Sequence, residues 1–142
     1  TPDIGNASTG NSQPANVIAG DKFTNTTSGV LTVVYDIVPV SADGCKGDMV
    51  QITLTVNPEP VLSPSLNKPV CSDVASGIVL DVAPGSVAAA SYNLTGINAA
   101  GGLVAGAGNA TTGNGLSANV ISSDAFTNTT GSPLTVVYDI VP

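Results

Sequence analysis

The chain repeats itself over a long distance. The segment Asp3–Pro39 recurs as Gly106–Pro142 at a constant offset of 103 residues, with 25 identities in 37 positions and no gap. The last nine residues of both segments, LTVVYDIVP, are identical. The period is much longer than the roughly 20–50 residues of a solenoid repeat, and it matches one β-sandwich domain of about 100 residues. The chain therefore contains parts of two copies of one module.

The repeat also predicts where the modules meet. A strand pattern ends just before Asn57–Pro60, and the two prolines there stop further strand pairing. We expect residues 1–60 to be the C-terminal part of one β-sandwich repeat and residues 61–142 to be the truncated N-terminal part of the next. The 142 residues would then cut across two modules of a longer tandem array. Residues that follow Pro142 would resemble Val40–Pro60.

Alternating patterns predict an all-β fold. Val50–Val56 alternates apolar and polar residues, as a half-buried strand does, and Leu31–Val38 is predicted as a second strand. The Asp43-Gly44 pair between them fits a hairpin turn. Residues 101–115 are either a pair of strands built from small residues or a loop. No window has helical periodicity. Further short strands are expected at Ile78–Val82, Tyr92–Thr95 and Asn119–Ile121.

Composition excludes several classes of function. The chain has three lysines, no arginine, no histidine and ten acidic residues, which gives a net charge of −7. A nucleic-acid-binding protein needs a basic surface, so no nucleic-acid partner is expected. Histidine is the usual proton shuttle and the commonest metal ligand, and we expect no enzymatic activity in its absence. No run of about 18 apolar residues predicts a membrane span, and the N-terminus does not resemble a signal peptide.

Several motifs together resemble a known family. The combination is similar to the PKD-like, immunoglobulin-like repeats of giant surface proteins in Bacteroidetes, and most closely to gliding-motility adhesins exported by the type IX secretion system. The resemblance implies immunoglobulin-like antiparallel β-sandwich repeats in tandem, in a protein held at the cell surface outside the cell. The motifs are VCSD at Val70–Asp73, NTT followed by LTVVY at Asn25–Tyr35 and Asn128–Tyr138, GCKG at Gly44–Gly47, and the closing strand Val50–Pro60.

The resemblance implies a structural stalk in a long filamentous adhesin for gliding motility and surface attachment. Its partners would be neighbouring repeats of the same chain and, through distant regions, the outer-membrane export and motility machinery. The substratum or a polysaccharide is a further candidate partner. The alternative is a glycan- or surface-binding module of a secreted protein, and a third class is an accessory domain of a secreted hydrolase. A binding loop should vary between repeats, whereas Asn25-Thr26-Thr27 recurs unchanged, which favours the stalk.

Cys45 and Cys71 are disulfide candidates, because exported proteins favour disulfides. The repeat gives each full module one cysteine of each type, so the partner of Cys71 is expected near position 148 and that of Cys45 before Thr1. Both partners would lie outside these residues. A Cys45–Cys71 bond is not expected, because a seven-residue strand and a proline junction separate the two positions. The alternative is a pair of free, buried thiols.

The hairpin loop contains the weak calcium candidates Asp43 and Asp48. Calcium takes about six to eight oxygen ligands, and the chain has no Asp-x-Asp-x-Asp run. We therefore expect these aspartates to be solvated loop side chains, with a calcium site as the alternative, and no other cofactor.

An aspartate and a tyrosine recur with the repeat. Asp21 returns as Asp124, and Tyr35 returns as Tyr138. We expect the aspartates to be solvated. A tyrosine on a late strand of an immunoglobulin-like sandwich packs in the core and hydrogen-bonds a nearby loop, which is the role expected here.

Overall fold

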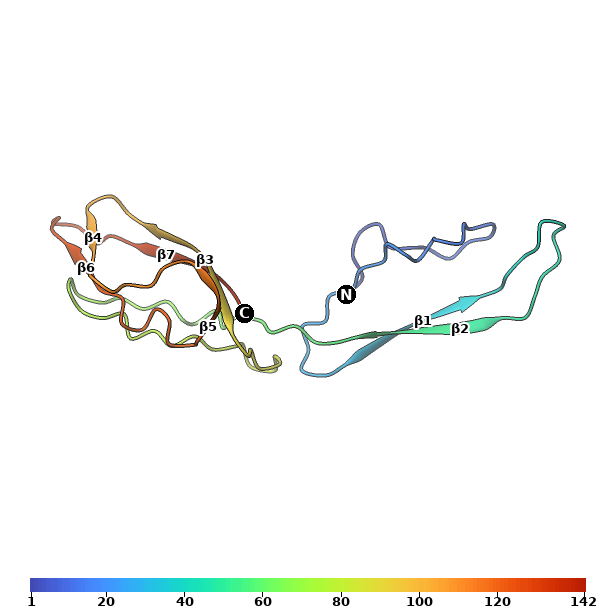
Figure 1. Cartoon of the computed structure of the whole chain (residues 1–142), viewed down its shortest axis with the longest axis horizontal. Helices are drawn as coiled ribbons and strands as arrows, with labels where there is room; N and C mark the ends of the chain where they lie inside the picture. The colour runs from blue at the N-terminus through green and yellow to red at the C-terminus, as the bar shows by residue number, and fades with distance from the viewer. The chain divides into compact units, whose positions relative to one another are not determined.

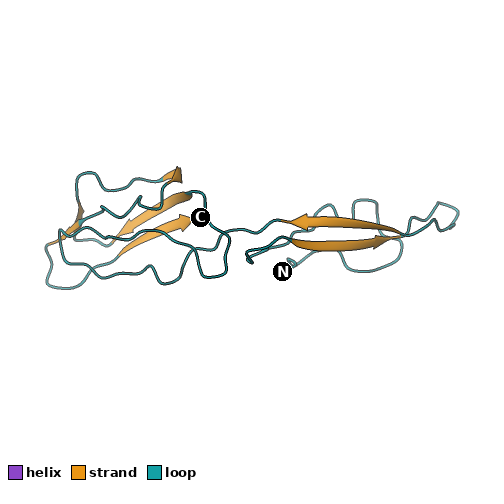
Figure 2. Ribbon diagram, turned by 90° about the horizontal axis from the view of Figure 1, so that it is seen from below, coloured by secondary structure: helices purple, strands orange, loops and turns teal.

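The computed structural model describes all 142 residues (Figure 1). The fold has no helix, and long irregular segments connect its strands (Figure 2). Every strand pairing is antiparallel, so the predicted all-β class is confirmed. No helix is long and apolar enough to cross a bilayer. The strands are β1 (Leu31–Ile37), β2 (Val50–Val56), β3 (Tyr92–Ala99), β4 (Leu103–Ala105), β5 (Gly113–Leu116), β6 (Phe126–Asn128) and β7 (Val136–Val141).

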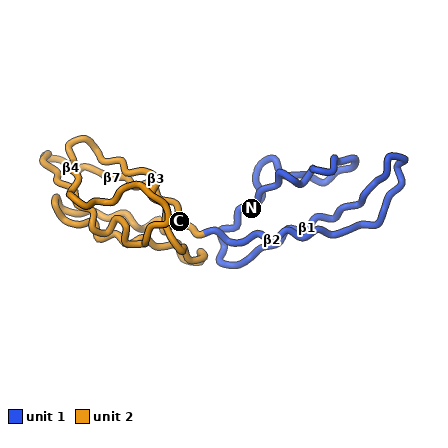
Figure 3. Tube along the Cα trace, viewed as in Figure 1, with its two compact units in different colours: residues 1–59 blue, residues 60–142 orange.

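The chain divides into two compact units, unit 1 (Thr1–Glu59) and unit 2 (Pro60–Pro142) (Figure 3). The division falls within Asn57–Pro60, where prolines closely follow β2. Proline lacks a backbone N–H and cannot extend a ladder there. Unit 1 contains the β1–β2 sheet. Unit 2 contains a three-stranded sheet in the order β5–β3–β7 and a two-stranded sheet β4–β6.

In unit 1, β1 and β2 form a ribbon with an unbroken register from Leu31↔Val56 to Ile37↔Val50. Paired residues point to the same side of a sheet, and successive residues alternate. One side of the ribbon therefore carries only apolar residues and Tyr35, and the other carries three threonines with Val34, Asp36 and Gln51. We call the first side the apolar face; its residues are Leu31, Val33, Tyr35, Ile37, Val50, Ile52, Leu54 and Val56.

The connection between β1 and β2 closes at the predicted Asp43-Gly44 turn. The Gly44 N–H donates to the Ser41 carbonyl at 3.0 Å, and the Ser41 N–H donates to the Cys45 carbonyl at 2.9 Å. Gly44 has a φ of 83°, in the left-handed region that glycine enters without a steric penalty. The turn chemistry read from the sequence is confirmed.

Unit 2 has a small apolar core. Alternation along β3 directs Tyr92 and Leu94 to one side of the sheet, and Leu94 is only 1% exposed. Leu80 reaches the core from an irregular segment, held by its N–H bond to the Ala118 carbonyl at 2.8 Å. Tyr138 of β7 packs against the same cluster. The four buried apolar side chains are Leu80, Tyr92, Leu94 and Ile121.

The sequence repeat is also a structural repeat. The bridge Pro2↔Phe23 in unit 1 corresponds to the pair Ala105↔Phe126 of the β4–β6 sheet. Just before the bridged phenylalanine, both copies contain a run of turns, at residues 14–21 and 117–124. At matching positions of the two runs, backbone N–H groups donate to the carbonyl three residues earlier. The two copies therefore share a backbone course, as expected from their sequence identity.

Two of the predicted strands are wrong. Asn119–Ile121 lies in the run of turns at 117–124. Ile78–Val82 forms only the isolated bridge Leu62↔Val82, because a run of turns beside it cannot supply a regular ladder. Residues 101–115 contain β4 and most of β5, which pair with β6 and β3 and not with each other.

Truncation of Leu94 tests the core. We expect Leu94→Ala to lower the free energy of unfolding of unit 2 by about 2–5 kcal/mol, because it removes packed methyl groups and leaves a cavity. Val104 is 61% exposed, and Val104→Ala should cost less than about 0.5 kcal/mol. Urea denaturation followed by circular dichroism measures both. Equal costs would show that Leu94 is not a core residue.

Candidate functional site

Unit 1 contains an aspartate that links three segments of the repeat. The Tyr35 hydroxyl, on β1, donates to Asp21 Oδ2 at 2.8 Å. Asp21 Oδ1 accepts from the Ala7 backbone N–H at 2.7 Å. Asp21 closes the run of turns through its own N–H, which donates to the Ile18 carbonyl. One carboxyl group thus connects the segment at Ala7, the run of turns at 14–21 and strand β1.

Unit 2 repeats this arrangement atom for atom. The Tyr138 hydroxyl donates to Asp124 Oδ2 at 2.9 Å, and the Ala110 N–H donates to Oδ1 at 2.7 Å. Asp124 is 2% exposed, whereas Asp21 is half-buried. The expectation of a solvated aspartate is therefore wrong for Asp124, because the core of unit 2 covers it. The role expected of Tyr138, in the core and bonded to a loop residue, is confirmed.

The two tyrosine hydroxyls are held in their protonated form. Burial raises the pKa of Tyr138 well above its usual value near 10, and the hydrogen bond to Asp124 and the charge of that residue raise it further. Loss of hydration, the bond to Asp21 and its charge raise the pKa of Tyr35 in the same direction. Both hydroxyls therefore act as stable donors, which suits a structural link.

A second recurring element is the Asn-Thr-Thr loop. Asn25 is 2% exposed, and its Nδ2 donates to the Gly29 and Val56 carbonyls at 2.8 and 2.9 Å. Its Oδ1 accepts from the N–H and hydroxyl of Thr27. Asn128 makes the corresponding bonds within its own loop, to Ser132 and Thr130. These bonds stabilise the loop in both copies, which explains why the Asn-Thr-Thr residues recur.

Sequence reasoning missed the roles of Asn25 and Asp124. The signal that could have found them is their invariance between the two copies, together with the fixed spacing of 14 residues between each aspartate and its tyrosine. A polar residue kept at a fixed distance from a strand tyrosine indicates a partner for its hydroxyl.

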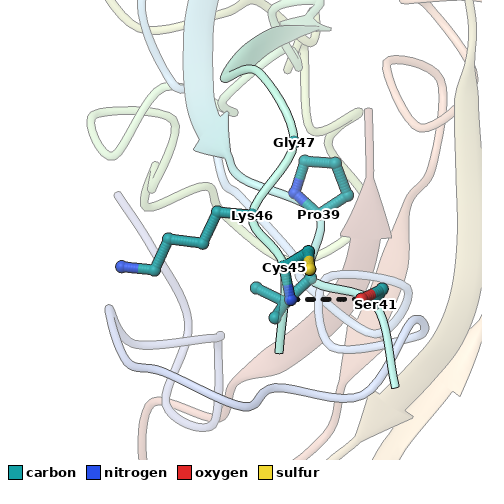
Figure 4. A pocket seen from close by; sticks show the side chains of 6 residues that line it. Pro39, Ser41, Cys45, Lys46 and Gly47 are labelled. Carbon is teal, nitrogen blue, oxygen red and sulfur yellow. Dashed lines mark hydrogen bonds between the residues drawn. The ribbon is translucent and has the colours of Figure 1, made fainter. Parts of the chain in front are cut away.

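Cys45 lies beside an open hollow of about 470 Å³ at the tip of the β1–β2 hairpin (Figure 4). Its N–H donates to Ser41 Oγ at 3.1 Å, and its thiol is free and exposed. Figure 4 shows the Lys46 side chain extending away from the sulfur. No carboxylate is among the residues that line the hollow, which leaves the thiol without a base to activate it. The lining residues are Pro39, Val40, Ser41, Cys45, Lys46 and Gly47.

Cys71, in unit 2, is also free and exposed. The alternative of two buried thiols is therefore wrong, because both positions lie in exposed irregular segments. Disulfide partners for Cys45 and Cys71 outside these residues stay a prediction.

No third acidic side chain joins the calcium candidates, and the calcium alternative stays a prediction. Asp43 and Asp48 are exposed, and no group of three or more His, Cys, Asp or Glu side chains gathers anywhere in the chain. Two carboxylates fall short of the roughly six to eight oxygens that calcium takes.

The sequence of unit 1 matches a known family model. Residues 3–60 match the family model of the PKD-like domain. This match supports a PKD-like repeat in unit 1. It contains β1, β2, the Asp21–Tyr35 link and Asn25, and PKD-like domains are typically extracellular structural or binding modules. The antiparallel all-β fold is consistent with the immunoglobulin-like β-sandwich of such domains. Comparison with curated proteins and with solved structures finds no match.

The two tyrosines form a matched pair of mutations. We expect Tyr138→Phe to lower the free energy of unfolding of unit 2 by about 1–3 kcal/mol, because it leaves a buried carboxyl oxygen without its donor. Tyr35→Phe should cost unit 1 less, since water reaches the half-buried Asp21. Amide hydrogen exchange followed by NMR resolves the two units. An effect at Tyr35 as large as at Tyr138 would contradict the importance of burial.

Alkaline pH should destabilise unit 2 through Tyr138. The folded state holds the hydroxyl proton more tightly than the unfolded state, so the stabilisation is complete below about pH 10 and is lost as the pH rises above it. Urea midpoints between pH 8 and pH 11.5 should fall for the wild type. The fall should be shallower for Tyr138→Phe, and identical profiles would refute the link.

Proposed function

We propose that the chain is part of a structural stalk of tandem PKD-like repeats in a long filamentous cell-surface adhesin. The observation that carries the proposal is the recurrence of one hydrogen-bond network in both copies, from the Asp–Tyr link to the Asn-Thr-Thr loop. Residues that recur because they form bonds inside each copy maintain the fold of the module and do not form a binding site. A binding site would instead vary its loops on a constant frame.

The adhesin would be exported by the type IX system, anchored outside the cell, and used for gliding motility and surface attachment. Its partners would be neighbouring repeats and, through distant regions, the export and motility machinery. The PKD-like match of residues 3–60 supports an extracellular module, and a net charge of −7 supports weak repulsion between neighbouring filaments. We propose no enzymatic role and no nucleic-acid partner.

One observation favours the alternative, a glycan- or surface-binding module. The tip of the β1–β2 hairpin exposes Val38, Val40 and Met49 by 44–56% beside the hollow at Cys45. An exposed apolar tip suits contact with a surface or polysaccharide.

Deletion of whole repeats from the full-length protein tests the proposal. Removal of successive 103-residue repeats should shorten the filament in proportion to the number removed, while export and attachment to the substratum persist. Electron microscopy with an antibody against residues 106–142 measures the length and the spacing of labels.

The control is a single-repeat variant in which Val38, Val40 and Met49 are replaced by serine. A stalk role predicts unchanged length and attachment for this variant. Loss of attachment at unchanged length would overturn the stalk proposal in favour of the binding module.

A further inference from the structure

Asn114 is the only asparagine of the chain that is followed by a glycine. The backbone nitrogen that follows an asparagine can attack the side-chain carbonyl of that asparagine and close a five-membered ring. A side chain on the following residue crowds this attack, and glycine has none. The Asn114-Gly115 pair is therefore the position where ring closure meets the least steric resistance.

The fold places this pair in a bulge of the β3–β5 ladder. Between the two paired positions of these strands, β3 has one residue, Asn93, and β5 has two, Asn114 and Gly115. A bulge leaves an extra residue outside the regular ladder of hydrogen bonds. Gly115 has a φ of 67°, in the left-handed region that glycine enters without a steric penalty. Strands β3 and β5 both belong to unit 2, so the bulge is formed within that unit.

Few contacts restrain the two groups that would react. Asn114 is exposed, and its side-chain amide has no hydrogen-bond partner in the chain. The Gly115 N–H donates to Asn93 Oδ1 at 3.1 Å, which is a side-chain oxygen and not a ladder carbonyl. A Cβ built on Gly115 would meet no atom within 4 Å, so the surroundings are open. The side-chain amides of several other asparagines are instead held by hydrogen bonds, namely those of Asn6, Asn25, Asn98, Asn109 and Asn128.

We propose that Asn114 is a site of spontaneous deamidation in the folded chain. The Gly115 backbone nitrogen loses its proton to hydroxide and attacks Asn114 Cγ. The new N–Cγ bond closes a succinimide ring, the Cγ–Nδ2 bond breaks, and Nδ2 takes up a proton from water and leaves as ammonia. Water then opens the ring at either of its two carbonyls, which gives aspartate or isoaspartate. The reaction needs no reactant besides water, and the inference does not depend on the proposed stalk function.

The products would alter β5 in two ways. Both add a negative charge beside Asn93, on a chain that is already acidic. Isoaspartate also routes the backbone through the former side chain and so lengthens β5 by one methylene group. The next residue but one, Leu116, pairs with Tyr92 and packs against the core, so a lengthened strand disturbs core packing. We therefore expect chains with isoaspartate at this position to unfold at a lower urea concentration than unmodified chains.

Peptide mapping by mass spectrometry tests the proposal on the folded full chain, kept warm in mildly alkaline buffer and digested at intervals. We expect Asn114 to be converted before every other asparagine, with both aspartate and isoaspartate formed and with a rate that rises with pH. Aspartate without isoaspartate would indicate direct hydrolysis and would overturn the ring mechanism. A free peptide of residues 111–117 gives the rate without the fold. An intact Asn114 in the folded chain after this peptide has been converted would show that β5 protects it, and would equally overturn the proposal.

The repeat supplies a matched control in unit 1. The counterpart pair is Asn11-Ser12, which is also exposed, and Ser12 has a left-handed φ of 56°. We expect Asn114 to react about tenfold faster than Asn11, which corresponds to a barrier lower by about 1.4 kcal/mol. Gly115→Ser gives unit 2 the sequence of unit 1 and should reduce the rate at Asn114 to that at Asn11, with an unchanged circular dichroism spectrum.

A second variant, Asn114→Gln, tests the effect on stability. Glutamine would have to close a larger ring, so this variant should keep its urea midpoint during storage while that of the wild type falls. Equal rates at Asn114 in the wild type and in Gly115→Ser would refute the role of the glycine and with it the proposal.

Discussion

The bond between a turn carboxyl and a strand tyrosine holds each copy of the repeat together. It joins the run of turns to the strand that carries the tyrosine, and the same carboxyl group also accepts from the backbone of an earlier segment. In unit 2 the bond is buried, because Asp124 lies among the core residues, and burial makes a lost partner costly. Asp21 forms the same bond in unit 1, where the carboxyl group is only half-buried.

Apolar cover distinguishes the two units. The β1–β2 ribbon has one apolar face, yet most of its side chains there are partly or largely exposed. Unit 2 instead buries four apolar residues in one core.

The polar residues of the repeat are mostly engaged within it. Asn25 and Thr27 bond each other and the backbone of their own loop, and the second copy does the same. Residues used in this way stabilise a module and offer little to a ligand. This agrees with the proposed stalk, and the exposed hairpin tip is the place where a surface contact would be sought.

The sequence by itself determined the all-β class, the structural repeat, strands β1 and β2 and the Asp43-Gly44 turn, because alternation and turn chemistry act over a few residues. Tertiary structure alone decided that Ile78–Val82 is not a strand, since a strand needs a regular neighbour and a run of turns lies beside it. It likewise decided the burial of Asp124 and the exposure of both thiols. Burial depends on what distant segments cover, and local pattern does not contain that information.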